Sequence, residues 1–148
     1  MAIKYFSDLS EAEVDLLLRT PALITLLIAG ADNDIDDKEK SLGEKLVNYR
    51  TFTSDTRLHE YYEAVNEDFE SKLSGMIDSW TPESKDAISG ELAQLNSITP
   101  KLEASYADLL KDSWRSLAKK VAEADGGFVG FGSISKEELA LIDLPMIE

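Results

Sequence analysis

Alternating carboxylates are the feature of this sequence best suited to chemistry. Asp32, Asp34 and Asp36 occupy every second position of a short polar stretch, and Glu39 follows them. Hard divalent cations are held by clustered carboxylate and carbonyl oxygens, and calcium-binding loops place such ligands at alternating positions. The spacing therefore indicates a candidate metal site, with Ca²⁺ or Mg²⁺ as the only cofactors implied.

The same stretch departs from a true EF-hand calcium loop. Counted from Asp32, the sixth position holds Asp37 where that loop has Gly, and the twelfth holds Gly43 where it has Glu. An ion-free interpretation also stays open, because aspartates are frequent in turns and Asp36 fits the capping position of a following helix. The residues thus leave two alternatives, divalent binding and a purely structural polar turn.

A second turn near the other end of the chain repeats the parts of the first. Each copy has an apolar helix that closes on Ala-Asp, a tight loop, an Ile and a residue that caps a new helix. The second loop, residues 126–132, is rich in glycine, but it follows a helix and lacks Gly-Lys-Ser/Thr, which argues against phosphate binding. It fits either a wide turn with an aromatic plug or a binding loop with exposed aromatic side chains.

The sequence predicts no catalytic residue. His59 is the only histidine, and nothing places a nucleophile and an orienting acid beside it. We therefore expect a protein that is not an enzyme. Hydrolysis by a metal-activated water stays as a disfavoured alternative, since it needs an open coordination position in a deep pocket.

The charge balance narrows the classes of partner. The chain holds 15 Lys and Arg against 29 Asp and Glu, a formal charge of −14. Phosphate backbones and anionic membrane surfaces repel such a chain, so we expect neither nucleic acid nor membrane as a partner. If the chain binds no ion, it fits an acidic helical adaptor whose favoured partner is a protein with a basic surface. A homodimer is a further alternative. With no cysteine, thiolate metal sites and disulfides are excluded.

Apolar side chains recur at helical spacing in nearly every segment, and no segment alternates like a strand. We therefore predict one all-α domain over residues 1–148, a bundle of about seven to eight helices with an internal pseudo-repeat. Residues 22–30 are apolar on nearly all sides, which predicts a central buried helix. The N-terminus lacks a signal-peptide layout and the longest apolar run is too short to span a bilayer, so a cytoplasmic protein is expected.

Local signals mark several helix boundaries. Ser10-Glu-Ala-Glu13 is a capping box, and Thr20-Pro21 either starts another helix or kinks the first. One long apolar stripe runs from Leu58 to Trp80. Thr99-Pro100 repeats the cap-plus-proline signal before the longest stripe, residues 102–124, and the apolar tail 144–148 is expected to pack on the body.

Both acidic turns resemble those of the tellurite-resistance TerB-like family, in which Ala-x-Ala-Asp-Gly precedes Ile-(Ser/Asp)-x-x-Glu. The matching residues are Ala29-Gly-Ala-Asp32 with Ile35-Asp-Asp-Lys-Glu39, and Ala122-Glu-Ala-Asp125-Gly126 with Ile134-Ser-Lys-Glu-Glu138. Asn33 departs from the frequent Gly, and residues 128–133 lengthen the second loop.

This resemblance implies an all-α bundle whose two loop-bearing helices lie close together, and a link to tellurite or stress resistance. It also implies a divalent-cation site formed by both turns. Its candidate ligands are Asp32, Asp36, Glu39, Asp125 and Glu138, with Asp34 as an additional acid.

Overall fold

The computed structural model describes residues 4–29, 55–81, 83–124 and 144–147. Its α-helices are α1 (Glu11–Ala29), α3 (His59–Asn66), α4 (Phe69–Asp78), α5 (Ser84–Ala93), α6 (Leu95–Ile98) and α7 (Ala104–Ala124). Short 3-10 helices are η1 (Lys4–Phe6), η2 (Thr56–Leu58) and η3 (Thr99–Lys101). These ranges contain no strand, so the predicted all-α class is confirmed.

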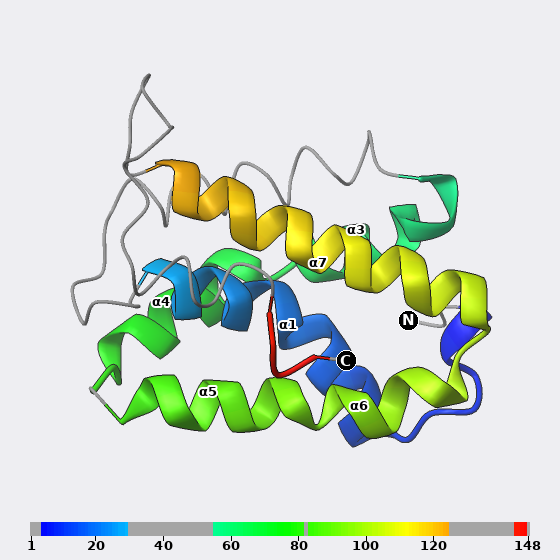
Figure 1. Cartoon of the computed structure of the whole chain (residues 1–148), viewed down its shortest axis with the longest axis horizontal. Coiled ribbons are helices and arrows are strands. Elements are labelled where there is room, and N and C mark those ends of the chain that lie inside the picture. Colours follow the sequence, from blue (N-terminus) through cyan, green and yellow to red (C-terminus); the bar gives the residue numbers. More distant parts are fainter. Residues whose placement is uncertain (1–3, 30–54, 82, 125–143, 148) are drawn as a thin grey trace.

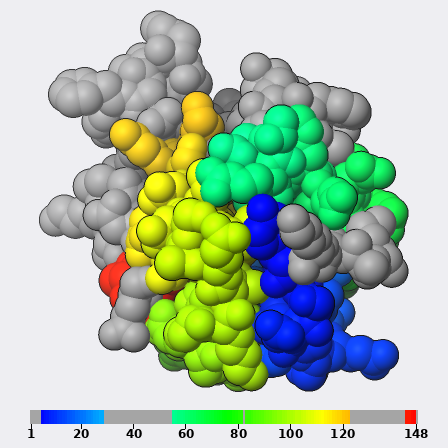
Figure 2. Space-filling model, turned by 90° about the vertical axis from the view of Figure 1, so that its right-hand side faces the viewer, coloured from blue at the N-terminus to red at the C-terminus, as the bar shows by residue number. Residues whose placement is uncertain are grey.

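Helix α1 lies at the centre of the bundle. It packs against α7 on one side, against α5 and α6 on the other, and against α3 and α4 as well (Figure 1). The second view shows η1 beside the start of α7 and the segment that begins with η2 (Figure 2). Aromatic rings hold this junction together, because Tyr5 stacks on Tyr106 with ring centroids 4.0 Å apart and Phe6 meets Tyr61 edge-on.

The burial of α1 follows from its composition. Residues 22–28 are at most 2% exposed, Thr25 included. Thr25 adds no unpaired polar group to this core, because its hydroxyl donates to the Pro21 carbonyl at 2.9 Å. A helix that is apolar on all sides must be covered on all sides. The predicted central helix is confirmed over these residues, and residue 30 of the prediction lies outside the described ranges.

The capping box at the start of α1 is confirmed. The Glu13 backbone N–H donates to the Ser10 hydroxyl at 3.2 Å, and the Ser10 N–H donates to a Glu13 carboxylate oxygen at 2.9 Å. The other Glu13 oxygen accepts from Lys101 Nζ at 2.6 Å. One carboxylate therefore satisfies the helix end and also ties it to η3.

The helix continues through Pro21, so the alternative that Thr20-Pro21 starts a new helix is wrong. Pro21 has no N–H to donate to the Leu17 carbonyl, four residues earlier. The Tyr61 hydroxyl, from α3, donates to that carbonyl instead, at 2.6 Å. Tyr61 in turn accepts from Trp114 Nε1 on α7 at 3.1 Å. These two buried hydrogen bonds link α1, α3 and α7 at the position where α1 lacks a backbone hydrogen bond.

Two other boundaries differ from the sequence pattern. The stripe that starts at Leu58 is divided, because α3 ends at Asn66 and α4 begins at Phe69. Thr99 and Pro100 form the 3-10 turn η3, and the long helix begins only at Ala104 after an extended Leu102. In both cases the buried face continues across the break, which is why the apolar spacing does not reveal it.

Helix α7 buries one face and leaves the other in solvent. Tyr106, Leu110, Trp114, Leu117 and Val121 are fully buried, whereas Asp108, Asp112, Lys119 and Lys120 are exposed. The C-terminal residues pack on the body as predicted over 144–147, with Leu144 and Ile147 buried. Asn96 Nδ2 donates to the Met146 carbonyl and Arg115 Nη2 to the Ile147 carbonyl, each at 2.8 Å.

Candidate functional site

The six predicted metal ligands all lie outside the described residues. They belong to the segments 30–54 and 125–143, which directly follow α1 and α7. These residues are Asp32, Asp34, Asp36, Glu39, Asp125 and Glu138. The structure therefore bears on this site only through the two helices that precede it.

Those two helices run in the same direction. Helices α1 and α7 pack along one another, and their C-terminal ends, Ala29 and Ala124, lie at the same end of the molecule (Figure 1). Two segments that are far apart in the sequence therefore leave the bundle from one end. This is the arrangement that a site shared between them requires.

The electrostatics of that end favour a positive ligand. The C-terminus of a helix carries a partial negative charge and leaves carbonyl groups without intrahelical partners. Lysine, arginine or histidine in the last turn commonly offsets this charge. Over their described lengths, neither α1 nor α7 has a basic residue in the last turn. Both helix ends thus add negative potential to a region that the sequence already makes acidic.

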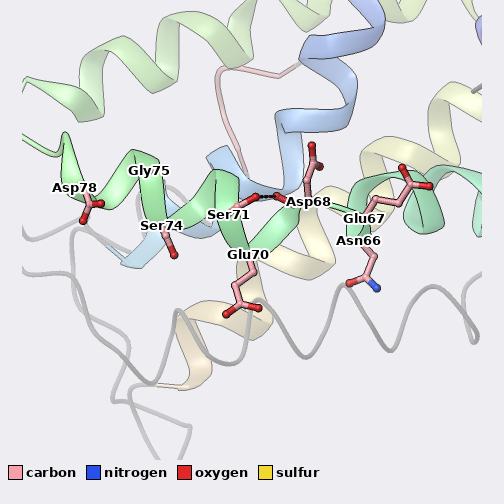
Figure 3. Close-up of a pocket in the computed structure, with 8 residues that line it drawn as sticks. All are labelled: Asn66, Glu67, Asp68, Glu70, Ser71, Ser74, Gly75 and Asp78. Atoms are coloured by element: carbon pink, nitrogen blue, oxygen red, sulfur yellow. Dashed lines mark hydrogen bonds between the residues drawn. The ribbon is translucent and has the colours of Figure 1, made fainter.

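A hollow on the surface of α4 is a separate feature. Its volume is about 690 Å³. We call it the acidic hollow; its lining consists of Asn66, Glu67, Asp68, Glu70, Ser71, Ser74, Gly75 and Asp78 (Figure 3). Among the described residues, this lining contains four carboxylates and no basic side chain. Lys72 lies beside it, with its Nζ 3.5 Å from Asp68 Oδ1.

The carboxylates of the acidic hollow do not converge on a point. The Asp68 and Glu70 side chains extend in opposite directions from the backbone, and Asp78 lies at the far end of α4 (Figure 3). Across the described ranges, no three His, Asp or Glu side chains are grouped so that they could hold a metal ion. The hollow therefore suits several separate basic groups better than one coordinated ion. Apolar periodicity does not reveal this hollow, although the density of acidic residues between Glu67 and Asp78 is a signal present in the sequence.

Two carboxyl groups have pKa values displaced by their partners. Lys101, followed by the Ser10 backbone N–H, lowers the pKa of Glu13. The backbone N–H of Arg57, followed by its guanidinium, lowers the pKa of Asp55. Hydrogen bonds to the ionised form cause both shifts. Both groups act at helix starts, so these shifts report capping rather than catalysis.

Comparison with known proteins adds no relative. The chain matches no protein-family model, no curated protein and no solved structure. The resemblance to the TerB-like family is accordingly carried by the two turns alone. Of the helices that the structure describes, none is both long and apolar enough to cross a membrane.

Proposed function

We propose that this chain is a non-enzymatic, TerB-like helical module that responds to a divalent cation, Ca²⁺ or Mg²⁺. The observation that carries the proposal is the parallel packing of α1 and α7, with both C-terminal ends at one end of the bundle. Acidic segments of matching pattern follow both helices in the sequence. A cation would neutralise the repulsion among those acids and between them and the two helix ends.

The proposed ligands come from both segments. Ca²⁺ takes six to eight oxygens, which is more than one short turn supplies. The first segment offers Asp32, Asp36 and Glu39, with Asp34 as an additional acid, and the second offers Asp125 and Glu138. The proposal includes helices within these segments, for about seven to eight in total, arranged as a pseudo-repeat. A cytoplasmic location and a role in stress or tellurite resistance belong to the same proposal.

Thermal unfolding with and without the ion tests this function. A ligand at a hundredfold excess over its dissociation constant stabilises the folded state by about 2.7 kcal/mol. We expect millimolar Ca²⁺ or Mg²⁺ to raise the melting temperature, and Asp32→Asn and Asp125→Asn each to abolish the increase. The double variant should lose no more than either single variant, because both acids serve one site.

Controls separate binding from general screening of charge. Sodium chloride at equal ionic strength should not reproduce the increase, since it only screens the net charge of −14. Asp86→Asn, at an exposed position on α5, should leave the ion effect intact. An ion effect that persists in Asp125→Asn would show that the two segments do not share an ion.

A second candidate function is that of an acidic adaptor for a basic partner protein. The acidic hollow supports this function, because four carboxylates line one open surface formed by α4 and the residues just before it. We expect a lysine-rich peptide to bind this chain with an affinity that falls as salt is added. The affinity should be lower still for the double variant Glu70→Gln with Asp78→Asn. Unchanged affinity in that double variant would show that the acidic hollow is not part of the binding surface.

A further inference from the structure

A smaller hollow lies between α1, α4 and α5, and its floor is apolar. Its volume is about 210 Å³. Leu23 and Leu26 from α1 and Ile88 from α5 line it, and these side chains are only 2%, 2% and 5% exposed. Met76 of α4 and the exposed Ala87 of α5 also line it. The space is large enough for one leucine, methionine or phenylalanine side chain, and we call it the anchor pocket.

The rim of the anchor pocket carries charge in a fixed arrangement. The Arg19 guanidinium lies between two carboxylates, with Nε 2.9 Å from Asp15 Oδ2 and Nη1 2.8 Å from Glu91 Oε1. Asp15 and Glu91 remain 59% and 37% exposed. Arg19 and Glu91 line the pocket and Asp15 lies beside it, so one cation is paired with two anions and the charge around the rim is net negative. An anionic ligand is therefore disfavoured here even though an arginine is present.

The three helices around the pocket extend this negative field. On each of α1, α4 and α5, acidic residues outnumber basic ones. The basic residues are themselves engaged: Arg19 as described, Lys72 with Asp68, and Lys85 in contacts of its own. The surroundings thus favour a positively charged binding partner, while the floor favours an apolar group.

We propose that the anchor pocket receives a single apolar side chain of a partner protein, flanked in that partner by lysine or arginine. The inference rests on the adaptor function, the second candidate above, and specifies how the partner is held. Interfaces draw most of their affinity from a few side chains buried in well-packed pockets. The acidic surroundings would accelerate and orient the encounter, and the anchor would slow dissociation.

Two matched peptides test the proposal. Both are helical and built from alanine and lysine, and they differ only at one central position, phenylalanine in one and alanine in the other. We expect the phenylalanine peptide to bind about tenfold or more tightly, the gain for burying one large apolar side chain. Affinity for both peptides should fall as salt rises, because the flanking lysines contribute through screened charge.

Methyl NMR locates the bound side chain. The chain has three methionines, so ¹³C-methyl labelling gives a simple spectrum. The Met76 resonance, assigned with Met76→Leu, should shift on binding of the phenylalanine peptide because Met76 lines the pocket. Met146 lies on the C-terminal segment held by Asn96 and should not shift.

A pocket-filling variant provides the decisive comparison. Ala87→Leu places a larger side chain in the hollow from an exposed helix position, so it should fold and reduce the phenylalanine preference to near unity. Ala12→Leu makes the same change at an exposed position of α1 outside the pocket and should leave the preference intact. Circular dichroism and the unshifted Met146 signal verify folding of both variants.

The outcomes separate this proposal from the function on which it rests. Salt-sensitive binding of both peptides with equal affinity would keep the adaptor function and overturn the anchor pocket. Binding of neither peptide at low salt would overturn both. A dimer in sedimentation that Ala87→Leu dissociates would show that a second copy of this chain occupies the pocket, and the partner proposal would be wrong.

Discussion

Removal of the Tyr61 hydroxyl tests how the bundle accommodates a proline within its central helix. Tyr61→Phe keeps the ring and its packing but deletes the one atom that joins Leu17 to Trp114. The Leu17 carbonyl loses the donor that replaces the absent N–H of Pro21. The Trp114 Nε1–H loses its acceptor at 3.1 Å. Both orphaned groups lie in a fully buried environment.

The magnitude follows from the two unsatisfied groups. A buried donor or acceptor without a partner costs about 1–3 kcal/mol. The hydroxyl itself was a buried polar group, so its removal offsets part of that cost. We expect Tyr61→Phe to lower the free energy of unfolding by about 2–4 kcal/mol, which for a chain of this size lowers the melting temperature by about 6–12 °C. Burial raises the pKa of Tyr61, so the hydroxyl stays protonated and the loss does not depend on pH near neutrality.

Urea denaturation followed by tryptophan fluorescence measures this difference, with an unchanged m-value as the sign that only stability has changed. Tyr106→Phe is the matched control. Tyr106 is as fully buried as Tyr61, but its hydroxyl has no hydrogen-bond partner among the described residues. The same substitution there should be neutral or slightly stabilising.

A double-variant cycle tests the role of the proline directly. Pro21→Ala restores the N–H that can donate to the Leu17 carbonyl, so the cost of Tyr61→Phe should be smaller in that background. Equal losses for Tyr61→Phe and Tyr106→Phe, or no coupling between Tyr61 and Pro21, would refute the reasoning.

Two further predictions concern the start of the central helix and the core of α7. Lys101 and Ser10 lower the pKa of Glu13 from its ordinary value of 4.5. The contribution of Glu13 to stability is therefore present above pH 4.5 and is lost as the pH falls through the lowered pKa. In Glu13→Gln, the melting temperature measured by calorimetry should depend less on pH between pH 6 and pH 3. Leu117→Ala, at a fully buried position, should cost about 2–5 kcal/mol in denaturant unfolding, whereas Glu60→Ala, at an exposed one, should stay within about 0.5. Similar shifts for the last two variants would show that the buried face of α7 is misassigned.

Local interactions are what the sequence predicts well in this protein. The capping box at Ser10 and Glu13 is confirmed because its donors and acceptors lie three residues apart and depend on nothing distant. The burial of residues 22–28 is likewise confirmed, since a helix without a polar face has only one stable position. The tail could be placed on the body from its apolar character alone.

Interactions between distant residues decide the features that the sequence left open. Where α1 continues through Pro21, the Leu17 carbonyl is satisfied by the hydroxyl of Tyr61, 44 residues after Leu17. The division between α3 and α4 is hidden because Val65 and Phe69 are both buried on the same face. The acidic hollow arises from how the α3–α4 turn presents its carboxylates, which periodicity does not describe. The predicted metal ligands lie outside the described ranges, so that site stays a prediction.

The parallel packing of α1 and α7 also has a consequence for the order in which the chain folds. Ribosomes add about 5–20 residues per second, so α1 is complete roughly 5–20 s before the last turn of α7 is made. Throughout that interval the apolar surface of residues 22–28 lacks α7, one of the helices that cover it. The least soluble segment is synthesised early and enclosed late. Truncated chains that end before α7, and variants that weaken its buried face, should therefore aggregate during synthesis rather than persist as smaller folded bundles.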